Sequence, residues 1–112
     1  MRSDRLYLAD ILDAIKAIEY FTAGIDEERF IADDLIQSAV LQKLSVIGEA
    51  AGRLSEATRA QVPEVSWKEI IGFRNVAVHA YFSVDWHIVF VTVIDDLPLL
   101  KRSVAMQLDR SN

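Results

Sequence analysis

Apolar residues recur at steps of three and four along most of this chain, which is the pattern of amphipathic α-helices. The first stripe predicts a helix from Asp4 to Phe21 that ends at Gly24, and its members are Leu8, Ile11, Ile15, Ile18 and Phe21. A second stripe predicts a long helix from about Asp33 to Leu54, with Ile36, Val40, Leu44, Ile47, Ala51 and Leu54 on one side. A connector with a turn of helix is expected between the two.

The C-terminal end of the second predicted helix is rich in small residues, namely Gly48, Ala50, Ala51 and Gly52. Small side chains let another backbone approach closely. We therefore expect a tight helix crossing at this point of the core.

The middle of the chain predicts two further helices. The segment EATRAQVPEV, which begins at Glu56, predicts a short helix that Pro63 stops, because proline lacks the N–H group that an interior helix position needs. Ser66 and Glu69 have the spacing of a capping box, which predicts that a third main helix starts there. Its apolar stripe consists of Ile70, Phe73 and Ala77.

The last predicted helix runs from about Val84 to Leu108, with Ser83 as its cap and Pro98 as the point where it kinks or divides. Residues from His87 to Ile94 are rich in Val and Ile and would also suit a strand, but no second strand-like segment exists to pair with them. The helical interpretation predicts an all-α protein. It would be an up-and-down bundle of four to five helices that forms one domain over residues 1–112.

The composition indicates an oligomer interface and limits which partners the protein can bind. Hydrophobic residues make up 52% of the 112 residues, a surplus that indicates a buried oligomer interface. The formal net charge of -5 argues against a broad electrostatic footprint for nucleic acid and leaves only a local basic patch. No cysteine is present, the N-terminus lacks the features of a signal peptide, and the longest apolar run is too short to span a bilayer. We expect a cytoplasmic protein without a membrane segment.

The stretch FRNVAVHAYF, residues 73–82, brings together an arginine, an asparagine, one of only two histidines and a tyrosine. On a helix, Arg74 and His79 would point about 140° apart, so they would not simply hydrogen-bond to each other. Asn75 and His79 would lie one turn apart on the same face, where the amide could orient the imidazole. Arg74 could swing toward the helix end, or the arginine of a second copy could fill the gap in a symmetric dimer. Either arrangement would make a small cationic cleft.

Such a cleft suits the cleavage of phosphodiester bonds in RNA. Arginine holds a phosphate by two hydrogen bonds, and histidine transfers a proton near neutral pH. The ribose 2'-hydroxyl is itself the nucleophile, so neither a metal nor another cofactor is required. The sequence offers no obvious metal site, since the neighbours Asp33 and Asp34, like Asp95 and Asp96, are expected to be a solvated cap or surface.

The same residues also have purely structural interpretations. Arg74 and His79 near a helix end could be a capping pair for the last carbonyl groups. Tyr81 and Phe82 could be core aromatic residues. His87 has no evident partner in the sequence and is interpreted as structural.

The motif also resembles that of a known family. RNVAVHAY fits the pattern Arg-x4-His-x-Tyr, which is similar to the signature of HepT toxins, a branch of the HEPN superfamily of helical ribonucleases. The segments VIGEAAGRLSE, SWKEIIGFRN, HAYFSVD and DDLPLLK resemble HepT segments in the same order. The resemblance therefore covers essentially the entire chain.

The resemblance implies a HEPN-like homodimer in which two motifs form a composite, metal-independent endoribonuclease site near the twofold axis. Arg74 and His79 would be the catalytic pair, with Asn75 in support. HepT toxins are paired with MNT antitoxins, nucleotidyltransferases that attach AMP to the motif tyrosine, here Tyr81. The implied protein is the toxin of a type II/VII-like toxin–antitoxin system, neutralised by AMPylation. The alternatives are a non-catalytic docking subunit for the nucleotidyltransferase and a purely structural helical dimer.

Overall fold

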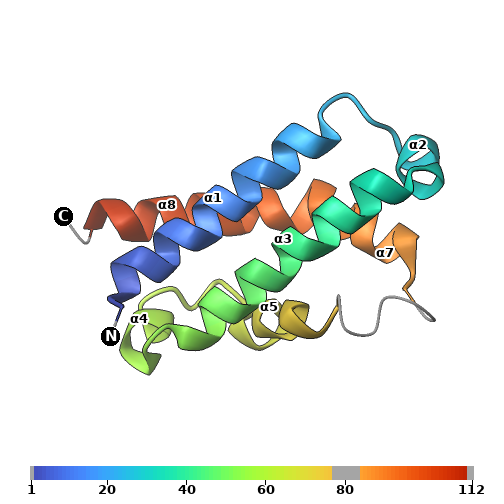
Figure 1. The fold of residues 1–112 in the computed structure, drawn as a ribbon. Coiled ribbons are helices and arrows are strands. Elements are labelled where there is room, and N and C mark those ends of the chain that lie inside the picture. The colour runs from blue at the N-terminus through green and yellow to red at the C-terminus, as the bar shows by residue number, and fades with distance from the viewer. Residues whose placement is uncertain (1, 77–83, 111–112) are drawn as a thin grey trace.

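The computed structural model describes residues 2–76 and 84–110, and all regular structure in these two ranges is helical (Figure 1). The elements in chain order are α1 (Asp4–Thr22), α2 (Glu27–Ala32), α3 (Asp34–Arg53), α4 (Glu56–Ala60), α5 (Trp67–Gly72), η1 (Phe73–Asn75), α7 (Trp86–Val91), η2 (Thr92–Asp96) and α8 (Leu97–Arg110). Of these, η1 is a 3₁₀ helix and η2 is π-helical. The predicted all-α class is confirmed.

The two long N-terminal helices form the framework of the core. Helix α1 packs against both α3 and α8 (Figure 1). The predicted stripes are buried at their central positions: Leu8, Ile11, Ile15 and Ile18 in α1, and Val40, Leu44, Ile47 and Ala51 in α3. Burying each large aliphatic side chain contributes about 1.5–3 kcal/mol relative to exposure, so packing holds these helices. Gly24 follows α1 as predicted, with a φ of 72° that favours glycine.

Side chains cap most of the helix N-termini. The capping residues accept hydrogen bonds from backbone N–H groups of the first turn, and they are Ser3, Asp26, Asp33, Ser55 and Asp85. The capping box predicted for Ser66 and Glu69 is wrong, because the Ser66 side chain makes no capping hydrogen bond. The indole N–H of Trp67 instead anchors the start of α5. It donates to the carbonyl oxygens of Arg59 at 3.1 Å and Val62 at 3.2 Å.

The last predicted helix is a succession of α7, η2 and α8 that runs from Trp86 to Arg110. Asp85 caps it, because its carboxylate accepts hydrogen bonds from the N–H groups of His87 at 3.0 Å and Ile88 at 3.2 Å. The prediction of Ser83 as the cap is therefore wrong, and Ser83 itself lies outside the described residues.

Pro98 disturbs this helix just before its own position. The N–H group of Leu97 donates to the carbonyl oxygen of Thr92, five residues earlier, within the π-helical segment. Proline has no N–H to donate and its ring crowds the carbonyl four residues before it, so regular α-helical bonding is interrupted there. The predicted disruption takes the form of a π turn, and the segment from His87 to Ile94 is helical as predicted.

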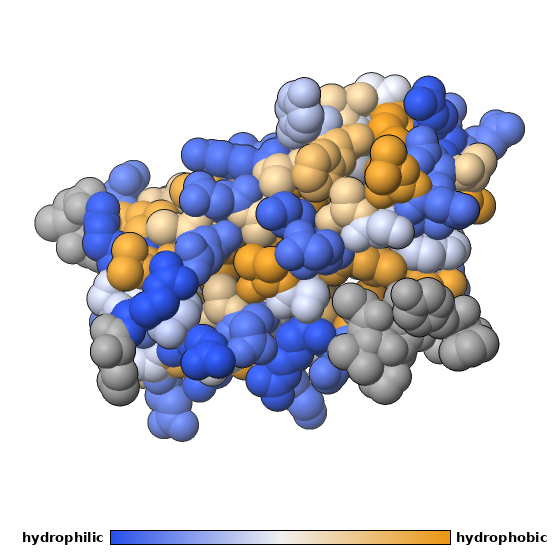
Figure 2. All heavy atoms as spheres, viewed as in Figure 1, coloured by the Kyte–Doolittle hydropathy of each residue, from blue (hydrophilic) through white to orange (hydrophobic). Residues whose placement is uncertain are grey.

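Apolar side chains are not all covered by this packing. Figure 2 shows apolar residues at the surface among charged ones on the face where α1 and α3 run side by side. Large apolar residues that stay exposed include Leu6, Ile31, Leu35, Ile88, Ile94, Leu99 and Met106. Part of the apolar surplus of the sequence therefore lies on the surface. In residues 2–76 and 84–110, no helix is both long and apolar enough to cross a membrane.

Candidate functional site

Arg74 lies on a short turn that continues α5. The 3₁₀ helix Phe73–Asn75 follows α5 directly, and the N–H group of Val76 donates to the carbonyl oxygen of Phe73 at 3.1 Å. Phe73 is half-buried and packs against the core, whereas Arg74 and Asn75 are exposed. The turn is thus held from its inner side and presents both polar residues at the surface.

The remaining motif residues follow this turn in the chain. His79 and Tyr81 lie outside the described residues. The one-turn relation between Asn75 and His79 therefore stays a prediction, and so does the alternative that Arg74 and His79 cap a helix end.

Helix α3 holds the Arg74 turn through Gly48. A Cβ atom added at Gly48 would lie 2.9 Å from the carbonyl carbon of Phe73 and 3.0 Å from the Cα atom of Arg74, with the Arg74 backbone nitrogen closer still. A real side chain does not fit against backbone at such distances, so this crossing requires glycine. The tight crossing predicted from the small residues of α3 is confirmed. The segment that crosses α3 there contains Arg74, the first residue of the motif.

Gly52, one turn further along α3, lies beside the Arg74 side chain. A Cβ atom added at Gly52 would lie 3.3 Å from Nη1 of Arg74. Gly52 is the next-to-last residue of α3, which ends at Arg53. The guanidinium therefore lies near the C-terminal turn of α3, where the partial negative charge of the helix dipole favours a cation.

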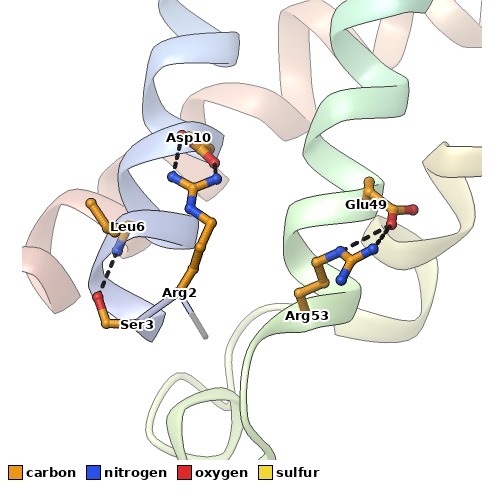
Figure 3. A network of polar contacts seen from close by, with 6 residues as sticks. All are labelled: Arg2, Ser3, Leu6, Asp10, Glu49 and Arg53. Atoms are coloured by element: carbon orange, nitrogen blue, oxygen red, sulfur yellow. Dashed lines mark hydrogen bonds and ion pairs between the residues drawn. The ribbon is translucent and has the colours of Figure 1, made fainter.

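The two arginines drawn in Figure 3 are each bound by a carboxylate, and Arg74 differs from them in this respect. Arg53 is bound by Glu49, with 3.0 Å between Nη2 and Oε1, and Arg2 is bound by Asp10, with 2.6 Å between Nη1 and Oδ2 (Figure 3). Among the residues that the structure describes, no carboxylate lies within ion-pair distance of Arg74. An arginine in this setting is suited to bind an external anion.

The chain is fixed again directly after the motif. The ring of Trp86 packs edge-on against the buried Phe30, with 6.0 Å between the ring centroids and 73° between the ring planes. His87 on α7 forms an ion pair with Glu27 on α2. The segment that contains His79 and Tyr81 therefore lies between two anchored parts of the chain. These are η1, which packs against α3, and the start of α7, which packs against α2.

The His87 pair agrees with the structural interpretation of this histidine and adds a partner that the sequence did not reveal. No partner for His87 was evident there, yet the structure provides Glu27, 60 residues earlier in the chain. The hydrogen bond with the carboxylate, together with its charge, raises the pKa of His87. No signal in the sequence alone identifies this pair, because it depends on how α2 packs against α7.

The two aspartate pairs were expected to be cap or surface, and this is confirmed. Asp33 caps α3, because its Oδ1 accepts a hydrogen bond from the N–H group of Ile36 at 3.0 Å. Asp34, Asp95 and Asp96 are exposed. Within the described part of the chain, no group of three or more His, Asp or Glu side chains could hold a metal ion.

Comparison with known families decides the relationship that the motif suggested. A family model described as "Ribonuclease HepT-like" matches residues 11–106, which include the whole motif from Arg74 to Tyr81. The chain belongs to the HepT-like ribonuclease family. The resemblance drawn from the sequence is therefore confirmed.

Three relatives of this HepT-like chain match it over nearly their whole length. "Probable ribonuclease HepT" of Thermococcus cleftensis is 41% identical over 100 residues, 89% of this chain and 91% of that protein. "Putative RNase MJ1380" of Methanocaldococcus jannaschii is 36% identical over 103 residues, 92% of this chain and 94% of that protein. "Putative RNase TTE0752" of Caldanaerobacter subterraneus subsp. tengcongensis is 34% identical over 104 residues, 93% of each chain. No solved structure matches this chain.

Proposed function

We propose that this HepT-like protein is a toxin that cleaves RNA internally without a metal ion. The observation that carries the proposal is the position of Arg74, which is exposed on a turn fixed by Gly48 and has no carboxylate partner among the described residues. Such a guanidinium can donate two parallel hydrogen bonds to a phosphate. Membership of a ribonuclease family agrees with this use of the arginine.

In the proposed reaction the chemistry is divided between Arg74 and His79. His79 accepts the proton of the ribose 2'-hydroxyl, and the 2'-oxygen attacks the adjacent phosphorus. The bond between phosphorus and the 5'-oxygen breaks, and that oxygen takes up a proton from water. The products are a 2',3'-cyclic phosphate and a 5'-hydroxyl. Arg74 stabilises the negative charge that grows on the phosphoryl oxygens, and Asn75 supports the orientation of the imidazole.

The proposed active form is a homodimer in which two motifs lie near the twofold axis and form one composite site. Exposed apolar residues such as Leu35 and Ile88 provide surface that a second copy can cover. Regulation is proposed to come from an MNT-type nucleotidyltransferase antitoxin that attaches AMP to Tyr81. The added phosphate would bring negative charge close to Arg74 and compete with the phosphate of RNA.

The second candidate function is a non-catalytic docking subunit for such a nucleotidyltransferase. The charge of the chain favours it, since 17 acidic side chains outnumber 12 basic ones and give a formal net charge of -5. An overall negative charge opposes RNA binding. In this case Arg74 and His79 would contact the partner protein, and their loss would weaken the complex without affecting RNA.

Cleavage of RNA in the presence of EDTA tests the proposal. Purified protein, shown by intact mass to carry no nucleotide, is incubated with a mixed pool of tRNA and mRNA beside the variants Arg74→Ala and His79→Ala. Two matched controls accompany them. Arg53→Ala removes an exposed arginine whose charge Glu49 already offsets, and His87→Gln replaces the only other histidine.

We expect cleavage by the wild type and by both controls, and loss of cleavage in the two motif variants with their folding intact. A wild type that leaves the RNA whole would favour the docking subunit instead. An unfolded His79→Ala variant would support a structural capping role for that histidine.

A further inference from the structure

We propose that Gly52 is a positioning residue for Arg74, and that Gly48 and Gly52 together aim the guanidinium at the RNA phosphate. This inference rests on the proposed function, because it takes Arg74 as the group that binds the phosphate. The two glycines are one turn apart on α3, and the turn that carries Arg74 crosses α3 at Gly48 while the Arg74 side chain reaches Gly52. Gly48 meets the backbone of this turn, and Gly52 meets the end of the arginine side chain.

Gly48 fixes where the Arg74 side chain starts. A Cβ atom at this position would lie 3.0 Å from the Cα atom of Arg74 and closer to its backbone nitrogen, so the turn is seated directly on the α3 backbone. Backbone atoms on both sides cannot give way as a flexible side chain can. The Cα atom of Arg74 therefore has one well-defined position relative to α3.

Gly52 leaves the space in which the end of the Arg74 side chain lies. A Cβ atom there would lie 3.3 Å from Nη1 of Arg74 and 3.7 Å from Cγ2 of Ile71. The distance to Nη1 is shorter than in most real contacts of a Cβ atom, so a methyl group would displace the guanidinium by a few tenths of an ångström. The last turn of α3 also attracts the cation through its dipole, which favours this position of the guanidinium although none of the described residues pairs it with a carboxylate.

The two glycines differ in what a methyl group would cost. At Gly48 the methyl group would meet backbone, and the fold itself would have to shift. At Gly52 it would meet the far end of a flexible side chain, which can move away without disturbing the fold. Gly52→Ala therefore separates the position of the guanidinium from the stability of the protein.

Gly72 offers a matched control close to the same turn. It is the last residue of α5, directly before η1, and a Cβ atom added there would have no atom of the described residues within 4 Å, apart from its chain neighbours and the backbone of its own helix. Gly72→Ala thus changes the same residue type next to the motif without touching Arg74.

The experiment compares Gly52→Ala, Gly72→Ala and the wild type in three measurements: the single-turnover rate of RNA cleavage, the affinity for uncleaved RNA, and the temperature of unfolding. Gly52→Ala is expected to unfold at the wild-type temperature or above, since alanine is the better helix former. Its cleavage rate is expected to fall by about tenfold, because catalysis depends on the exact placement of the charge that meets the transition state. Its RNA affinity should stay within about twofold of the wild type, since a small displacement weakens ground-state binding less. Gly72→Ala should match the wild type in cleavage rate and RNA affinity and, like Gly52→Ala, unfold at the wild-type temperature or above.

A spectroscopic measurement tests the contact without using activity. The NMR signal of the Arg74 Nε–H group can be assigned by its disappearance in Arg74→Lys. It should shift in Gly52→Ala and keep its position in Gly72→Ala.

The outcomes separate this inference from the function on which it rests. If Arg74→Ala abolishes cleavage while Gly52→Ala cleaves at the wild-type rate, Gly52 does not position the arginine and the inference is overturned. A Gly52→Ala protein that unfolds well below the wild-type temperature would overturn it too, because the role would then be structural. If the wild type does not cleave RNA, or Arg74→Ala cleaves as fast as the wild type, the proposed function fails and the inference falls with it.

Discussion

His87 on α7 and Glu27 on α2 form an ion pair between segments that lie 60 residues apart in the chain. The hydrogen bond with Glu27, and then the negative charges of Glu27 and Asp85, raise the pKa of His87. A group with a raised pKa stabilises the fold while it is protonated. This contribution is complete below the ordinary histidine pKa of about 6.5 and is lost as the pH rises through the folded pKa.

We therefore predict that the wild type unfolds at a higher temperature than His87→Gln at about pH 6, and that the difference disappears by about pH 9. The difference should be small, because both side chains are solvent-accessible. Thermal unfolding followed by circular dichroism measures it. A difference that is the same at every pH would show that the charge of His87 is not involved, and Glu27→Gln should remove the pH dependence as well.

Asp4 in the first turn of α1 is tied to the start of α4. Its Oδ2 accepts hydrogen bonds from the hydroxyl groups of Ser55 and Thr58, each at 2.5 Å, and its Oδ1 accepts one from the N–H group of Ser55 at 3.0 Å. These hydrogen bonds, the one from the Ser55 hydroxyl first, lower the pKa of Asp4. The stabilisation is present above the ordinary value of about 3.9 and is lost as the pH falls through the folded pKa.

Asp4→Asn is accordingly predicted to lower the free energy of unfolding by about 1 kcal/mol at neutral pH. Urea unfolding at a series of pH values measures this loss, which should shrink as the pH is lowered below about 3.9. An equal loss at neutral and acid pH would mean that the carboxylate charge contributes nothing.

Gly48→Ala is predicted to destabilise the protein, in contrast to the other helical glycines near the motif. The methyl group would clash with the backbone of Phe73 and Arg74, and overpacking of this kind costs about 1–3 kcal/mol. A gain of at most about 1 kcal/mol from helix propensity offsets part of that cost. Urea unfolding beside Gly72→Ala, where the described residues outside the same helix leave open space, gives the comparison. Equal stability of the two variants would contradict the close crossing.

The serine caps of α4 and α5 should respond differently to the same substitution. Ser55 accepts a hydrogen bond from the N–H group of Thr58 at 3.2 Å, whereas Ser66 makes no capping hydrogen bond. Ser55→Ala should therefore cost about 1 kcal/mol of unfolding free energy, and Ser66→Ala should cost much less. Chemical denaturation of both variants tests this. A larger loss for Ser66→Ala would restore the capping box that the sequence suggested.

The sequence predicts the helical framework because helix periodicity is a local property. The stripes of α1 and α3 are buried as their spacing indicates, and the small residues around Gly48 correctly predict a close crossing. The periodicity of α3 could not indicate which segment crosses it at Gly48, because that segment contains Arg74, which lies far along the chain. The crossing nevertheless joins two features that the sequence had singled out separately.

The failed predictions concern positions where tertiary contacts decide between local options. Ser66 fits the pattern of a capping box, but the indole of Trp67 anchors α5 through carbonyl groups of the preceding segment. Asp85 caps α7 in place of Ser83. For His87 the structural interpretation was correct, but its partner Glu27 lies on α2, which no spacing rule connects with α7.

Arg74 is the residue on which the proposed function depends most directly. The decisive measurement is the rate of RNA cleavage in EDTA by Arg74→Ala, compared with the wild type and with Arg53→Ala. We predict that Arg74→Ala loses at least about 100-fold in rate, because it lacks the charge that stabilises the transition state, and that Arg53→Ala keeps the wild-type rate. Equal rates for Arg74→Ala and the wild type would contradict the assignment of this site.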